Sequence, residues 1–374
     1  MITSCRERIE RGRDLCLTDC PAARASGAFR YVRVEKPDDL PDAEERGLDV
    51  VILDMNHGWP NLGHDSIVHA VRDIACDLRR ELAGARMHLR ALSFDVRGSG
   101  VLPALPGPRF SIYVGTGGPG HIDPHLNDGR SAGSQGIRED PSWEAPLFRL
   151  FDAIVASESA SLLAVCHTFG VLCRWSGVAR PVLRGPEKGG KSTGVRENIL
   201  SLEAAEHPWF QSFARGLADG RRLRIVDNRL YDLIPDPRPL PSGILPLGYE
   251  TTEIGGPPGD ALTMLEFARE KGGVMPRVFA VNHHPEVVDP RHERLILERK
   301  WAHGEVSRSW YEERERMLTE RAVANDLEAR IQHTSRFTFH GPLRFHVYQK
   351  MRERAEALGA PWSVHEDVVT GNAA

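Results

Sequence analysis

Short apolar runs rich in β-branched residues alternate along this chain with stretches whose apolar residues recur at helical spacing. The runs that predict buried strands cover residues 49–54, 88–96, 110–114 and 161–166. Residues 64–82 and 141–157 carry the helical pattern between them. Strands that alternate with helices favour a parallel sheet with helices on both faces. The predicted fold class is therefore α/β, with a doubly wound and mostly parallel sheet.

The pattern is less regular on both sides of this region. Further predictions are strands at 29–34, 222–226 and 277–283, a proline-rich loop at 235–246, and helices at 261–271 and 310–330. From residue 291 onward the chain is dense in Arg, Glu and His. We therefore predict a leader with one added strand over 1–47, a main domain over 48–290, and a helical C-terminal extension over 291–374.

Composition narrows the class of protein. Of 374 residues, 27% are charged and 41% hydrophobic, which is ordinary for a globular protein, and the net charge of −4 gives no reason to expect a nucleic-acid partner. No apolar stretch approaches the length of a membrane span. The first residues carry charges of both signs without an apolar segment, so we expect no signal peptide and a cytoplasmic location. Cys5, Cys16 and Cys20 lie near the start, but we expect reduced thiols rather than a metal site there.

Candidate chemistry lies at the ends of three predicted strands. The run 279–288 delivers His284 and, two residues later, Glu286, which is a base followed by an acid that can orient it. The run 161–166 ends in Cys166, a candidate nucleophile. The run 110–120 ends in a Gly-Gly-Pro-Gly turn. Ligands of parallel sheets bind at the carboxyl ends of the strands, so these three pieces are expected to meet.

In this order the three pieces resemble the class I glutamine amidotransferase family, over roughly residues 48–290. The resemblance implies a flavodoxin-like sheet and a Cys166, His284, Glu286 triad. It implies that Cys166, on a nucleophile elbow, attacks a glutamine side-chain amide, that a thioester forms, and that the released ammonia passes to a separate synthetase. The oxyanion and substrate contacts that it implies come from Gly117, Gly118, Gly120 and His167. No metal or other cofactor is expected.

The elbow departs from the family pattern Gly-x-Cys-x-Gly-His-Gln. Thr168 replaces its second glycine, and a β-branched residue resists the strained dihedrals that an elbow needs. Gly170 stands where the family has a Gln that helps to hold glutamine. Residues 121–142 form an inserted loop expected near the site. Two alternatives therefore stay open: an amidase acting on a different γ-glutamyl or amide substrate, and a catalytically silent domain that serves as a regulatory or binding subunit.

Two other motifs point to different chemistry. Residues 185–192 match the phosphate-binding pattern GxxxxGK[ST], which defines a third hypothesis, a nucleotide hydrolase that uses Lys191. The preceding strand is short and the motif interrupts the amidotransferase pattern, so we expect a surface turn and a nearly neutral Lys191→Ala. His121, Asp123 and His125 could ligate a metal, but we expect ordinary polar loop residues there.

Overall fold

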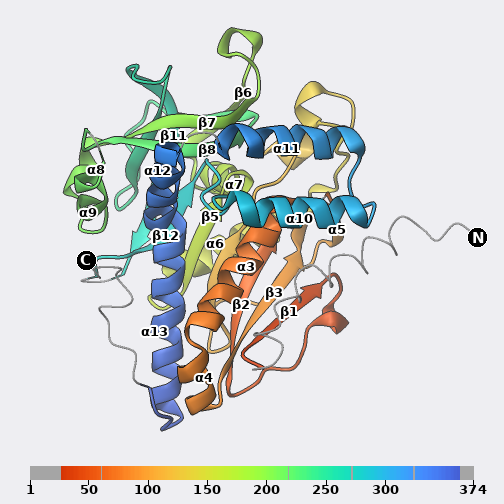
Figure 1. Cartoon of the computed structure of the whole chain (residues 1–374), viewed down its shortest axis with the longest axis vertical. Helices are drawn as coiled ribbons and strands as arrows, with labels where there is room; N and C mark the ends of the chain where they lie inside the picture. Colours follow the sequence, from red (N-terminus) through yellow and green to blue (C-terminus); the bar gives the residue numbers. More distant parts are fainter. Residues whose placement is uncertain (1–26, 60, 218, 271–272, 323–324, 363–374) are drawn as a thin grey trace, which may run out of the picture.

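A twelve-stranded sheet forms the centre of the computed structural model, which describes residues 27–362 except 60, 218, 271–272 and 323–324. Half of the sheet is parallel and carries the predicted strands except the one at 222–226, which lies in the antiparallel half (Figure 1). In spatial order these are β1 (Phe29–Val34), β3 (His88–Asp95), β2 (Gly47–Asp54), β4 (Phe110–Gly115), β5 (Ser161–Val165) and β12 (Pro276–Val281). The prediction of an α/β fold with a mostly parallel central sheet is confirmed.

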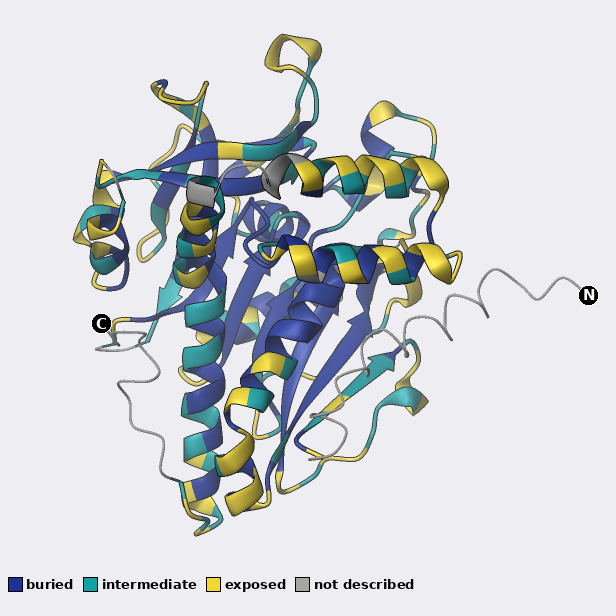
Figure 2. Ribbon diagram, in the orientation of Figure 1, coloured by how far each residue is buried: buried dark blue, intermediate teal, exposed yellow. Residues whose placement is uncertain are grey.

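Each face of the parallel strands is covered by a separate apolar cluster. In β2, Val50 and Ile52 join one cluster while Val51 and Leu53 join the other, because successive side chains point to opposite faces. Helix α3 (Leu62–Asp77) covers the first face, whereas α6 (Glu144–Ala156) and α7 (His167–Ser176) cover the second. Burial on both sides explains the nearly continuous apolar run of β2, whereas the edge strand β1 is partly exposed (Figure 2).

Beyond β12 the sheet continues with antiparallel strands. They are β11 (Pro258–Arg269), β10 (Leu245–Thr251), β7 (Ser192–Leu200) and β8 (Arg222–Arg229), while β9 (Tyr231–Pro235) joins β11 to β6 (Ala179–Leu183). The prediction of a helix at 261–271 is wrong. Its apolar residues mimic helical spacing because β11 is buried on both faces between β12 and β10, which removes the alternation typical of a half-exposed strand.

Short elements complete the chain outside the sheet. The helix predicted at 64–82 is two helices, α3 and α4, separated at Leu78. The shorter helices are α4 (Arg79–Ala85), α5 (Val96–Ser99), α8 (Leu202–Glu206) and α9 (Phe210–Arg215), and the 3-10 turns are η1 (Pro37–Asp39), η2 (Pro124–Leu126), η3 (Ala132–Ser134), η4 (Pro141–Trp143) and η5 (Pro186–Lys188). Within the described ranges, none of the helices has the length and apolar character that crossing a membrane requires. Cys5, Cys16 and Cys20 lie outside the described residues.

The C-terminal extension packs against the main body of the protein. It comprises α10 (Pro290–Ala302), α11 (Arg308–Ala322), α12 (Asn325–Ser335), the π-helical segment η6 (Arg336–His340) and α13 (Gly341–Ala357). Helix α13 lies beside α3 in Figure 1, and its buried Leu343 and Val347 belong to the same apolar cluster as α3. Lys300 of α10 pairs with Asp65 of α3 at 2.8 Å. The division of the chain at residues 47 and 290 stays a prediction.

We expect Leu343→Ala to lower the free energy of unfolding by about 2–5 kcal/mol, because its fully buried side chain would leave a cavity against the sheet. Leu295→Ala is the matched control: this leucine of α10 is 53% exposed, and its loss should cost less than about 0.5 kcal/mol. Urea unfolding monitored by circular dichroism measures both values. Equal small effects would mean that α13 does not contribute to the core.

Candidate active site

The turn between β5 and α7 holds Cys166 in a backbone conformation that few residues adopt. Its φ is 49° and its ψ is −99°, and a non-glycine residue at such positive φ costs roughly 1–3 kcal/mol. The Cys166 amide donates a hydrogen bond to the Val281 carbonyl of β12 at 2.8 Å. The strand end, the helix start and the neighbouring strand together hold the thiol at the sheet's carboxyl edge.

Thr168 supports this turn instead of being strained by it. It lies in the first turn of α7, and its hydroxyl donates to the Thr116 carbonyl at 2.7 Å. Its methyl group fills the space above Gly115, where a Cβ would overlap the threonine side chain. The expectation that Thr168 must adopt strained dihedrals is therefore wrong, because Cys166 takes the strained conformation and Thr168 is helical.

The glycine turn brings backbone close to both candidate catalytic side chains. A Cβ at Gly117 would lie 2.9 Å from His284 Cε1 and 3.5 Å from Cys166 Cβ, and a Cβ at Gly118 would overlap the Met55 carbonyl oxygen. Glycine is the residue type that permits such approaches. Gly120 differs, because its amide already donates to Gln135 Oε1 at 3.0 Å.

His284 and Glu286 form a buried pair behind the thiol. Nδ1 of His284 lies 2.8 Å from Oε1 of Glu286, whose side chain has no exposed surface. The carboxylate sits against Gly63 in the first turn of α3, where a Cβ would overlap Oε1. A helix N-terminus favours negative charge, so the carboxylate of Glu286 lies at the favourable end of α3.

His283 and His284 are adjacent, but their surroundings shift their pKa values in opposite directions. Burial lowers the pKa of His284, but the negative charges of Glu286 and Cys166 outweigh it, so the pKa stands well above the ordinary 6.5. Burial lowers the pKa of His283 to about 3, so its ring is neutral. No described nitrogen or oxygen hydrogen-bonds to Nε2 of His284, so this atom is left to exchange a proton with the thiol.

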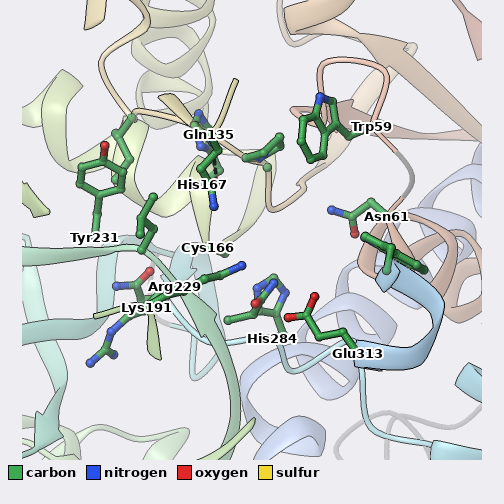
Figure 3. A pocket seen from close by; sticks show the side chains of 18 of the residues that line it. Trp59, Asn61, Gln135, Cys166, His167, Lys191, Arg229, Tyr231, His284 and Glu313 are labelled. Atoms are coloured by element: carbon green, nitrogen blue, oxygen red, sulfur yellow. Dashed lines mark hydrogen bonds between the residues drawn. The ribbon is translucent and has the colours of Figure 1, made fainter. Parts of the chain in front are cut away.

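The predicted site residues surround one cavity of about 270 Å³ (Figure 3). Cys166, His167, His284, Gly118 and Gly120 line it, while Gly117 and Glu286 lie behind this lining. The structure thus brings together every candidate from the three strand ends. Further lining residues that the sequence analysis missed are Lys191, Arg229, Tyr231, Asn282, Trp310, Glu313 and Arg314.

The interpretation of residues 185–192 needs correction. A strand, β7, follows this motif where a phosphate-binding loop requires a helix, so the hypothesis of a nucleotide hydrolase of that type is wrong. Lys191 is not on a remote surface turn, because it lines the same cavity as Cys166. No sequence spacing relates Lys191 to Cys166, since the antiparallel part of the sheet brings them together.

The loop 121–142 forms one wall of the cavity. Arg97 pairs with Glu139 at 2.6 Å and also donates to the carbonyls of Met55 and Pro119, so it fixes both the loop and the glycine turn. Ile122 covers Gly170, where a Cβ would lie 2.5 Å from its Cδ1 atom. A larger residue at position 170 would therefore displace the loop.

The three potential metal ligands of this loop do not converge. His121 lies against the Tyr231 hydroxyl, whereas His125 and Asp123 contact each other at 3.1 Å. Across the described ranges, no group of three or more His, Cys, Asp or Glu side chains is placed to hold a metal ion.

Comparison with solved structures finds several chains of partly similar shape. SMU.1228c is 16% identical over 78% of this chain and 99% of its own, with a TM-score of 0.42. A putative GMP synthase component from Thermoplasma acidophilum is 14% identical over 72% and 98%, with a TM-score of 0.38. A chain of PurLQS from Thermotoga maritima is 10% identical over 68% and 98%, with a TM-score of 0.36. Structural similarity at these TM-scores and identities does not support a conclusion about function.

Neither a family model nor a curated protein matches the sequence.

We expect Glu286→Gln to lower the pKa of His284, because the Glu286 carboxylate is the largest of the influences that raise it. Because the pKa of His284 is raised in the folded protein, its attraction to Glu286 stabilises the fold, and this stabilisation is complete at pH values below the unfolded pKa of about 6.5. It is lost as the pH rises through the folded pKa of His284. The loss of stability caused by Glu286→Gln should accordingly be larger at pH 6 than at pH 9.

An NMR titration of His284 and urea unfolding at the two pH values measure these effects. Glu298→Gln, an exposed change on α10, is the matched control and should leave both unchanged. An unaltered His284 titration in Glu286→Gln would contradict the pairing.

Proposed function

We propose that this protein is a cysteine-dependent amide hydrolase of the class I glutamine amidotransferase type. The observation that carries the proposal is the position of the Cys166 thiol, on a strained turn and in one cavity with a buried His284–Glu286 pair. Nucleophile, base and orienting acid in this order are the requirements of acyl transfer by a thiol.

In the proposed reaction the sulfur of Cys166 attacks the carbonyl carbon of a side-chain amide. His284 holds the thiol proton and donates it to the departing nitrogen, so the C–N bond breaks, ammonia leaves and a thioester remains. Water then attacks the thioester with His284 as its base, which releases the acid and restores the thiol. Glu286 orients His284 through Nδ1 and stabilises its positive charge.

The negative oxygen of each tetrahedral intermediate needs hydrogen-bond donors. We assign this role to the backbone amides of Gly118 and His167, which line the cavity and donate to no acceptor within the described part of the chain. Gly120 contributes through the shape of the turn, because Gln135 already occupies its amide. Gly117 leaves room for the His284 ring.

The identity of the amide is the open part of the proposal. Glutamine is the substrate that the family resemblance implies, and its ammonia would pass to a separate synthetase. In the family, the residue at the position of Gly170 carries a side chain that helps to hold glutamine. Here Ile122 fills the space that such a side chain would need. This contact favours, as the second candidate, an amidase acting on another γ-glutamyl or amide substrate.

The test compares two thiol reagents on the intact protein: a glutamine-mimicking diazoketone and the small neutral alkylator iodoacetamide. We expect one diazoketone adduct per chain, at Cys166, and none in Cys166→Ala. Cys76→Ala, a change at another partly buried cysteine, is the matched control and should keep the adduct. Intact mass and peptide mapping measure the outcome.

His284→Ala should abolish ammonia release. It also leaves Glu286 without its partner, so circular dichroism must first show that the variant is folded at the assay temperature. Labelling of Cys166 by iodoacetamide alone would support the second candidate. Full activity in His284→Ala would contradict the assignment of His284 as the base. A Cys166 that resists both reagents would contradict the whole assignment and make the silent regulatory domain the better hypothesis.

A further inference from the structure

Among the described residues, two cationic side chains of the cavity form no ion pair with an acid of another element. Lys191 precedes β7 and lines the same cavity as Cys166 and Glu313 (Figure 3). Its neighbour Lys188 pairs with Asp232 at 2.9 Å, whereas no described carboxylate lies within ion-pair distance of the Lys191 amine. Burial and the nearby charge of Arg314 lower the pKa of Lys191, and the charges of Glu313 and Asp227 offset this only in part.

Arg314 on α11 is the second of these cations. Its guanidinium lies 5.3 Å from the centre of the Trp310 ring, and Nη1 lies 3.3 Å from the sulfur of Met317. The nearest described carboxylate belongs to the adjacent Glu313, at 3.7 Å from Nη1. Packing on Trp310 and Met317 thus holds the guanidinium in place while most of its hydrogen-bond donors stay unused.

The third cation of the cavity, Arg229, pairs with several carboxylates of other elements. Arg229 on β8 lies within 3.2 Å of Asp232 and 3.6 Å of Asp227, and it also pairs with Glu250. A further donor does remain unused: the side-chain amide of Asn282 is 2% exposed, lines the cavity, and its nitrogen has no hydrogen-bond partner in the described structure. Buried donors without partners are costly unless a ligand binds them.

We infer that Lys191 and Arg314 form an anion subsite, at which the non-reacting end of the substrate places a carboxylate or phosphate group. This inference rests on the proposed function for the reacting end and narrows the substrate to amides that carry such an anion. Both cations come from outside the strand ends that supply the catalytic residues, one from the antiparallel part of the sheet and one from the C-terminal extension. The antiparallel part of the sheet and the C-terminal extension therefore provide the substrate selectivity.

The test uses a pair of alkylators of nearly equal size, anionic iodoacetate and neutral iodoacetamide, and reads the rate at the Cys166 peptide. An anion subsite predicts that the ratio of the iodoacetate rate to the iodoacetamide rate exceeds that of free cysteine by about 5- to 10-fold, as expected for opposite charges that attract in a partly buried site. Higher ionic strength should reduce this excess. Lys191→Met and Arg314→Met should each lower the ratio severalfold.

Arg316→Met is the matched control, because Arg316 is exposed on the same helix and does not line the cavity. Its ratio should equal that of the wild type. A wild-type ratio no higher than that of free cysteine, or an unchanged ratio in both Lys191→Met and Arg314→Met, would overturn the inference. If Arg314→Met does not fold, Lys191→Met decides alone. If neither reagent alkylates Cys166, the cavity is closed to small anions and the inference is wrong.

Protection of Cys166 from iodoacetamide distinguishes the two sources of the anion. Stronger protection by glutarate indicates a carboxylate, and stronger protection by inorganic phosphate indicates a phosphate group. Because these rates need only an accessible thiol, they stand even if the protein releases no ammonia. Conversely, ammonia release without any preference for iodoacetate would leave the proposed function intact and remove the anion subsite.

Discussion

The left-handed backbone at Cys166 is the constraint on which the arrangement of the site depends. Such a turn is stable only where its surroundings enforce it. Here Thr168 ties the start of α7 to the Thr116 carbonyl, and the end of β12 accepts the Cys166 amide. The same contacts fix the distance between the thiol, the glycine turn and His284. The site is therefore a property of how three parallel strands end side by side.

A second constraint acts on the base. Glu286 lies at the N-terminus of α3, and the C-terminal extension closes over the segment that carries it. The hydroxyl of Ser335 donates to the Pro285 carbonyl, and Thr338 lies 3.4 Å from Nε2 of His283. His284 and Glu286 are both buried, so their charges interact more strongly than they would in water. The C-terminal extension thus contributes to the site in two ways. It contacts the residues on both sides of His284, and it supplies Arg314 to the cavity lining.

Sequence patterns could predict the parallel strands because each is a short apolar run that folds by local rules and burial alone. They could also place Cys166 and His284 at one edge, since the carboxyl ends of parallel strands meet. They failed at 261–271, where burial on both faces imitates helical spacing. Lys191 and Arg314 could not be predicted, because only the antiparallel strands and the packing of α11 bring them to the thiol.

The central claim is that the thiol of Cys166 becomes acylated during turnover. The most direct test mixes the protein with glutamine and, in a parallel arm, with the carboxylate-bearing amide glutaramate, quenches in acid within the first turnover, and maps the peptides by mass. The account predicts an acyl thioester on Cys166 with at least one of the two amides and none in Cys166→Ala. Ammonia release without an acyl group on Cys166, an acyl group on another residue, or no acylation with either amide would contradict it.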